Sequence, residues 1–86
     1  MNINQLIEIV KNKLNQNIVC ENIEVEDKTF LHKSHRSHEK NKFHIKLIIT
    51  SDYLKKKSKI NSTKEIYKIL NKELKKNIHS IQILII

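Results

Sequence analysis

The feature that most constrains this chain is the complete absence of glycine and proline from its 86 residues. Any turn that needs a positive φ must therefore use asparagine, aspartate or a strained residue. The same absence rules out motifs that cradle phosphate on a glycine-rich loop, including the P-loop and the dinucleotide-binding fingerprint. A nucleotide-binding enzyme of either kind is thereby excluded.

The length of the chain favours one small domain over residues 1–86, and not an enzyme. A chain of this size buries roughly 60–65% of its unfolded surface, which leaves little room for a deep catalytic cavity. No stretch approaches the ~20 apolar residues that span a bilayer, and the N-terminus shows no signal-peptide pattern. The lone Cys20 cannot form an internal disulfide. We therefore expect a cytoplasmic monomer without a membrane partner.

The net charge of +8 is unevenly distributed along the chain. Residues 1–27 carry two lysines against five acids, whereas residues 28–86 carry fifteen basic residues against four acids. Sixteen of the seventeen basic residues are lysine, a bias typical of A+T-rich genomes. Codon bias explains the excess charge more easily than its segregation, so a nucleic-acid partner stays a second interpretation.

Apolar periodicity predicts the elements of the first half. Residues 3–16 fit an amphipathic helix, and residues 19–27 alternate as in an edge strand. In that strand one face would carry Val19, Glu21, Ile23 and Val25. Residues 28–42 have no periodicity and predict a long basic loop. Residues 43–51 predict a strand with inward-pointing Phe43, Ile45, Leu47 and Ile49.

The second half predicts a helix and a final strand. A polar connector over 52–61 precedes Ser62-Thr63-Lys64-Glu65, which has the S-x-x-E pattern of a capping box and predicts a helix start. The stripe behind it consists of Ile66, Ile69, Leu70 and Leu74. Residues 80–86 are nearly all apolar, which predicts a strand covered by helices and neighbours.

The resulting order, αββαβ, predicts the fold class. It is an α+β domain with a three-stranded mixed sheet, in which the first two strands form a hairpin across the long loop. The βαβ unit needs a right-handed crossover, so both helices should cover one face of the sheet.

Histidine and lysine clusters are the candidate functional residues. The loop holds His32, His35 and His38, and His44 opens the next strand. These imidazoles suit metal ligation or a pH-sensitive cationic patch, and an incidental solvated loop is the alternative. Five lysines could bind phosphates, and a solvated charge run is the alternative. They are Lys55, Lys56, Lys57, Lys59 and Lys64. Cys20 is best interpreted as a small buried hydrophobe.

Four segments together resemble the BolA family: DKTFLHKSH, FHIKLIITSD, EIYKILNKEL and IHSIQI. The likeness covers residues 3–83 and rests on the order and spacing of the segments. It implies the family's fold, a variant of the class II KH topology. It further implies a non-enzymatic partner of monothiol glutaredoxins in iron–sulfur cluster assembly, trafficking or iron-linked regulation.

In that family a [2Fe–2S] cluster can be shared with the glutaredoxin and glutathione. The resemblance implies a loop ligand, His32 when counted from Asp27 or His35 when counted from His44. The family's second ligand is a histidine at the helix start, and Thr63 stands in its place here. A hydroxyl is a poor substitute for imidazole on cluster iron, which predicts weaker cluster ligation from this position.

Three functions are compatible with these residues. The chain could bind a glutaredoxin without a cluster, hold a labile cluster through loop histidines, or bind DNA as a regulator of stress response and cell morphology, as some family members do. KH domains hold nucleic acid with a Gly-x-x-Gly loop, which a glycine-free chain lacks.

Overall fold

The structure, a computed structural model, describes residues 1–29 and 42–86, and most of the predicted loop 28–42 lies outside these ranges. The elements follow in the order α1 (Ile3–Asn17), β1 (Asn22–Asp27), β2 (Phe43–Thr50), α2 (Asp52–Lys55), α3 (Lys59–Ile69), α4 (Asn71–Lys76) and β3 (Ile78–Ile85). None of the helices in the described ranges is long and apolar enough to cross a bilayer.

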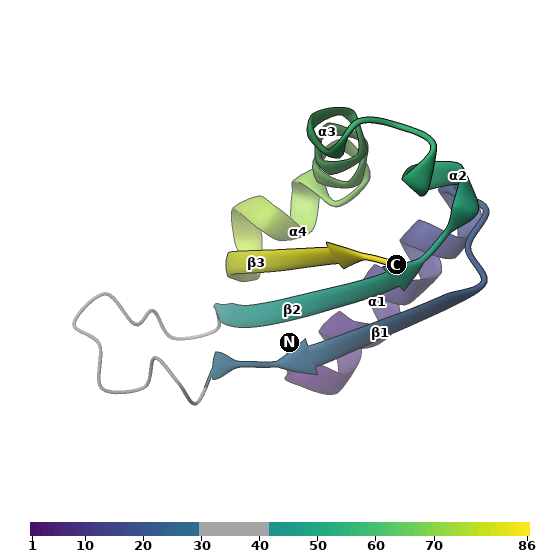
Figure 1. The fold of residues 1–86 in the computed structure, drawn as a ribbon. Coiled ribbons are helices and arrows are strands. Elements are labelled where there is room, and N and C mark those ends of the chain that lie inside the picture. Colours follow the sequence, from purple (N-terminus) through teal and green to yellow (C-terminus); the bar gives the residue numbers. More distant parts are fainter. Residues whose placement is uncertain (30–41) are drawn as a thin grey trace.

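The sheet has the predicted mixed topology, with the strand order β1-β2-β3 (Figure 1). β1 and β2 pair antiparallel, from Asn22 opposite Thr50 to Asp27 opposite Ile45. β2 and β3 pair parallel, with a bulge beside Phe43. The expected hairpin and crossover connection are therefore both confirmed.

The helices pack on one face of the sheet and share one core. α1 begins with a capping box in which Asn2 and Gln5 exchange side-chain and backbone hydrogen bonds. The core cluster joins residues of α1, of the strands and of the later helices, namely Leu6, Val10, Leu14, Ile18, Ile23, Ile45, Leu47, Ile49, Leu54, Ile66, Leu70 and Ile78. β2 lies in the middle of the sheet, so its residues Ile45, Leu47 and Ile49 lie at the centre of the core cluster.

An ion pair fastens α1 to α4 beside this core. The Lys13 Nζ donates to both carboxylate oxygens of Glu73, at 2.8 and 2.7 Å. The Glu73 side chain is almost fully buried, and Lys13 is about one-third exposed. A buried carboxylate needs such a partner, because removing its charge from water costs several kcal/mol. The attraction of the Lys13 ammonium offsets a cost of that order.

The helix caps show how a chain without glycine makes its turns. The cap residues Ile18, Lys56, Leu70 and Asn77 all have negative φ, between −135° and −74°. α3 and α4 are consecutive helices that meet at Leu70. None of these four positions therefore needs the left-handed conformation that favours glycine.

A chain of serine hydrogen bonds organises the connection that leaves β2. Ser51 is fully buried, and its Oγ accepts from the Leu54 N–H at 3.1 Å and donates to the Val19 carbonyl at 2.7 Å. Its backbone N–H donates to the Ile86 carbonyl at 3.2 Å. The buried Ser62 Oγ then donates to the Leu54 carbonyl at 2.9 Å. These bonds link the segment before β1, the end of β3, α2 and α3.

The predicted capping box at Ser62 is wrong. The helix begins one turn earlier, at Lys59, where Ser58 accepts a hydrogen bond from the Asn61 N–H. Ser62 lies inside α3 and uses its hydroxyl on Leu54, while Glu65 bonds to other side chains. The connector over 52–61 accordingly holds the short helix α2 and the first residues of α3.

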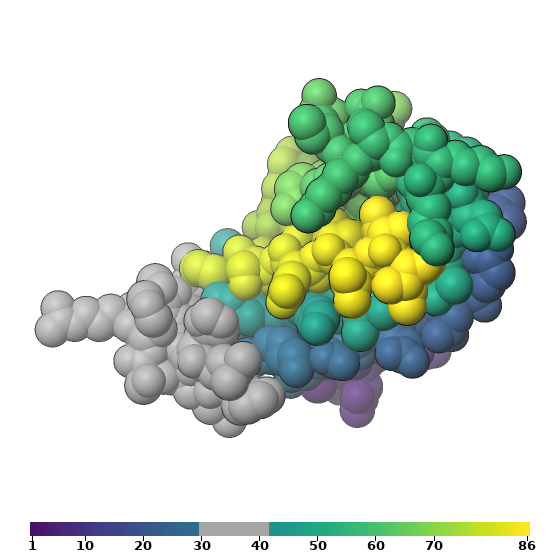
Figure 2. All heavy atoms as spheres, viewed as in Figure 1, coloured from purple at the N-terminus to yellow at the C-terminus, as the bar shows by residue number. Residues whose placement is uncertain are grey.

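The first and last strands also differ from the sequence prediction. β1 begins at Asn22, and Val19 is 76% exposed rather than part of its inner face. β3 was expected to be covered, but it lies at the edge of the sheet, with Leu84 43% and Ile86 48% exposed. Figure 2 shows β3 reaching the surface. A continuous apolar run does not distinguish a covered strand from a half-open edge.

We expect Ser51→Ala to lower the free energy of unfolding by about 1–2 kcal/mol, because it removes a helix cap and the donor to the Val19 carbonyl. Chemical denaturation measures this change. The matched control is Ser58→Ala, which removes only an exposed cap and should cost less. An equal or larger loss in the control would contradict the organising role of Ser51.

Candidate functional site

A groove lies between α3 and β3 on the described surface. It has a volume of about 350 Å³. Its lining residues come from α2, α3, the turn between them and the end of β3, and they are Leu54, Lys55, Lys57, Lys59, Ser62, Thr63, Ile83, Leu84 and Ile85. We call this the α3–β3 groove. The serine hydrogen bonds described above place α2 and α3 around it.

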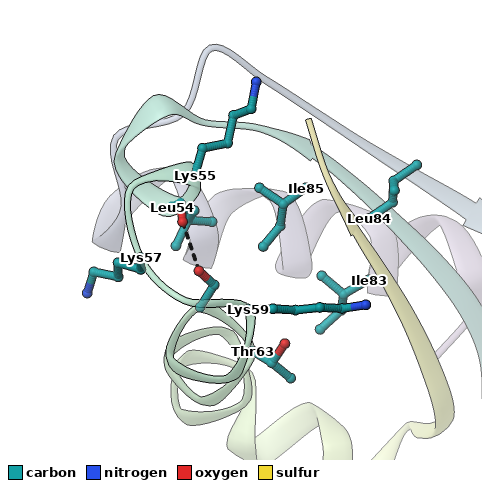
Figure 3. A pocket seen from close by; sticks show the side chains of 9 residues that line it. Leu54, Lys55, Lys57, Lys59, Thr63, Ile83, Leu84 and Ile85 are labelled. Atoms are coloured by element: carbon teal, nitrogen blue, oxygen red, sulfur yellow. Dashed lines mark hydrogen bonds between the residues drawn. The ribbon is translucent and has the colours of Figure 1, made fainter.

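The groove combines an apolar floor with basic walls. In Figure 3 the side chains of Lys59 and Thr63 point from α3 toward β3. The side chains of Ile83 and Ile85 extend from β3 into the space between the strand and the helix. Within residues 1–29 and 42–86, neither Lys55 nor Lys59 has an acidic partner. Apolar surface beside such cations suits a ligand that is itself part apolar and part anionic.

Lys57 differs from the other two groove lysines, because it takes part in a local cluster. Its Nζ lies 2.7 Å from the Glu65 carboxylate and 4.6 Å from the centre of the Tyr53 ring. The Tyr53 hydroxyl donates to the other Glu65 oxygen at 2.9 Å. The hydrogen bond to Glu65 raises the pKa of Lys57, and the same bond lowers the pKa of Glu65. Lys57 points away from β3 in Figure 3.

The candidate phosphate-binding lysines do not all face the groove. Lys55, Lys57 and Lys59 line it, whereas Lys56 and Lys64 are exposed residues outside the lining. Tyr53, the one aromatic residue of the connector, is engaged by Lys57 and Glu65. A platform for stacking nucleic-acid bases needs free aromatic faces. The geometry therefore adds no support to the nucleic-acid interpretation.

A second polar cluster lies at the opposite end of the sheet, where the chain leaves toward the predicted loop. The Thr29 Oγ1 accepts from the His44 N–H at 3.2 Å, and the Lys28 N–H donates to the His44 carbonyl at 2.7 Å. The buried His44 ring lies 2.6 Å from the Ser80 Oγ through Nδ1. These contacts hold the base of the loop and the orientation of the ring.

His79 joins this cluster and was not among the candidates from sequence. Its ring centre lies 4.8 Å from that of His44. The two residues are far apart in the chain and come together because β2 and β3 pair parallel. Ile78 pairs with Phe43 and Ser80 with His44, so His79 is the extra residue of the bulge. No sequence pattern specifies such a register, so the pairing could not be foreseen.

The described residues do not complete the iron site that the family resemblance implies. His32 and His35 lie outside the described ranges, and Thr63 has only a hydroxyl. No group of three or more histidine, cysteine or acidic side chains in residues 1–29 and 42–86 could hold a metal ion. Thr63 lies beside Ile83–Ile85, whose partners on β2 are Leu47–Ile49, whereas β2 begins at Phe43, about 13–20 Å away along the strand.

Cys20 lies outside β1 and is partly buried. Its Sγ donates to the Ile18 carbonyl at 3.3 Å. Desolvation, helped by the nearby charge of Glu21, raises the pKa of its thiol. A thiol that is protonated at neutral pH is a weak nucleophile and a weak metal ligand.

Glu65→Gln should lower the melting temperature slightly at pH 7, and this difference should shrink as the pH falls toward 3. The Glu65 pKa is lowered in the folded state, so its stabilising contribution is present above the unfolded pKa of about 4.3 and disappears as the pH falls through the folded value. Thermal melts of both proteins at the two pH values measure the difference. A difference that is as large at pH 3 as at pH 7, or larger, would contradict the Lys57–Glu65 geometry.

The comparisons with known proteins agree with this fold. A family model described as BolA-like protein matches residues 14–86. No curated protein sequence matches the chain. The BolA domain of SufE1 from Arabidopsis thaliana superposes with a TM-score of 0.79 at 27% identity, covering 99% of this chain and 92% of that one.

Two further solved structures share the fold at lower identity. BolA1 from Arabidopsis thaliana gives a TM-score of 0.75 at 18% identity, covering 92% of this chain and 87% of its own. A bol-like protein from Babesia bovis gives 0.71 at 14% identity, with coverages of 93% and 81%. Since the family model covers most of its length, the chain belongs to the BolA-like protein family.

Proposed function

We propose that this chain is a non-enzymatic, cytoplasmic partner of a monothiol glutaredoxin in iron–sulfur cluster assembly or trafficking. Membership of the BolA-like family supports the proposal. The observation that supports it is that Thr63, at the position where the resemblance implies a histidine ligand, lies in the first half of α3 and lines the α3–β3 groove. We therefore take the α3–β3 groove as the surface that receives the partner.

The chemistry of the groove suits this partner. A glutaredoxin that carries a cluster also holds glutathione, whose two carboxylates are anionic at neutral pH. Lys55 and Lys59 stand beside the groove without an acidic partner in the described part of the chain. Lysine pairs with carboxylates through charge-assisted hydrogen bonds, so these side chains favour the approach of such a complex.

Replacement of the ligand limits what this chain contributes to the cluster. The Thr63 hydroxyl is a poor substitute for an imidazole on iron, so a loop histidine, His32 or His35, is the ligand that we propose from this side. The glutaredoxin thiolate and glutathione would then hold the cluster more firmly than this chain does. Such an arrangement suits transient contact during transfer better than storage.

Titration of the ¹⁵N-labelled chain with a monothiol glutaredoxin tests the partnership. We expect amide shifts in the first half of α3 and in Ile83–Ile85, because these segments form the groove. The exposed face of α1 serves as the internal control and should not respond. Shifts confined to α1, or no shifts at all, would contradict the proposed surface.

Thr63→His tests the effect of the missing ligand. Restoring an imidazole next to the groove should lengthen the lifetime of a shared [2Fe–2S] cluster against a chelator about tenfold, a gain on the order of one metal-ligand partner. Visible circular dichroism of the glutaredoxin complex follows the decay. Lys64→His, one residue along α3 and outside the groove lining, is the matched control. Equal lifetimes in both variants would contradict this account of Thr63.

A further inference from the structure

β3 is an edge strand that has no charged residue or proline to protect its edge. Among the described residues it pairs with β2 alone. Its eight residues, IHSIQILI, include no lysine, no other permanently charged side chain and no proline. Soluble proteins commonly place such residues on exposed edges to prevent pairing with another chain. In a chain with 30% charged residues, their absence from β3 favours a strand that a partner covers.

The hydrogen bonds at the end of β3 show which backbone groups face outward. The Ile86 N–H donates to the Ile49 carbonyl, and the Ser51 N–H donates to the Ile86 carbonyl, so Ile86 faces β2. Because successive residues of a strand alternate, Ile81, Ile83 and Ile85 direct their N–H and carbonyl groups to the free edge. Ile83 and Ile85 also line the α3–β3 groove. The groove therefore runs beside backbone groups that have no strand partner among residues 1–29 and 42–86.

We propose that the α3–β3 groove binds an extended acidic segment of a partner protein, which adds to the free edge of β3 as a fourth strand. Backbone pairing with Ile81, Ile83 and Ile85 would supply affinity, and the apolar floor would receive alternate side chains. Acidic residues in the segment would face Lys55 and Lys59. The inference rests on the proposed function in taking this groove as the partner surface, and it specifies how the partner binds there.

Charge complementarity favours this occupant over a second copy of the chain. A second β3 would bring no acidic residue to Lys55 and Lys59, and two chains of net charge +8 repel each other. A single-stranded nucleic acid offers anionic charge but no strand to pair with the outward amides. An acidic peptide satisfies both the lysines and the edge.

A synthetic eight-residue peptide with alternating valine and glutamate tests the proposal on the full chain. Its control has the same sequence and charge but carries N-methyl groups on alternate residues, which prevent strand pairing. We expect the unmethylated peptide to slow hydrogen exchange at Ile81, Ile83 and Ile85. The methylated peptide should bind at least about tenfold more weakly, since it loses two or more hydrogen bonds.

Two lysine variants test the charge requirement. Lys59→Glu should weaken binding of the unmethylated peptide about fivefold or more, because it replaces an attraction with a repulsion. Lys72→Glu makes the same charge change on the exposed surface of α4, away from the groove lining, and should have a much smaller effect. Equal losses in the two variants would reduce the interaction to net charge and overturn the proposed contact.

Other outcomes would also overturn this inference. They are equal affinity of the two peptides, dimerisation of the free chain through β3 in sedimentation experiments, and displacement of the peptide by a single-stranded oligonucleotide that binds the groove more tightly. If glutaredoxin shifts the groove signals while the peptide does not bind, strand addition fails and the proposed function stands. If the peptide binds and glutaredoxin does not, the proposed function fails instead.

Discussion

The buried hydroxyl of Ser51 is the interaction on which the functional half of the molecule depends. It caps α2 through the Leu54 N–H and reaches back to the Val19 carbonyl before β1, while the Ser51 backbone N–H bonds to the end of β3. Ser62 adds α3 to the same network through the Leu54 carbonyl. These four hydrogen bonds pair the buried polar groups of the turn after β2, so the turn holds its shape without glycine. The α3–β3 groove has its geometry from this arrangement.

The same arrangement separates the two regions in which the chain could handle an anionic or metal-bearing partner. The groove with Thr63 lies near the end of β2, and the cluster of His44, His79 and Ser80 lies near its beginning. Lysines dominate the first region and imidazoles the second. With no imidazole on the α3 side, the groove has the chemistry of a docking surface rather than that of a ligand set.

Much of the fold was predictable because its signals are periodic. The spacing of Leu6, Val10 and Leu14 placed α1, and the alternation of Ile45, Leu47 and Ile49 placed the inner face of β2. The predicted helix start at Ser62 was wrong because an S-x-x-E pattern is local. It does not show that the buried Leu54 carbonyl competes for the serine hydroxyl. Neither the edge position of β3 nor the meeting of His44 with His79 is encoded in a local pattern, since both depend on strand order and register.

We propose that partners bind at the α3–β3 groove and at the free edge of β3. Hydrogen exchange of the Ile81, Ile83 and Ile85 amides, measured in the complex with a monothiol glutaredoxin, tests it most directly. We expect these three amides to become protected while the exposed amides of α1 do not change. Protection of α1 with unchanged exchange at the three β3 amides would contradict it.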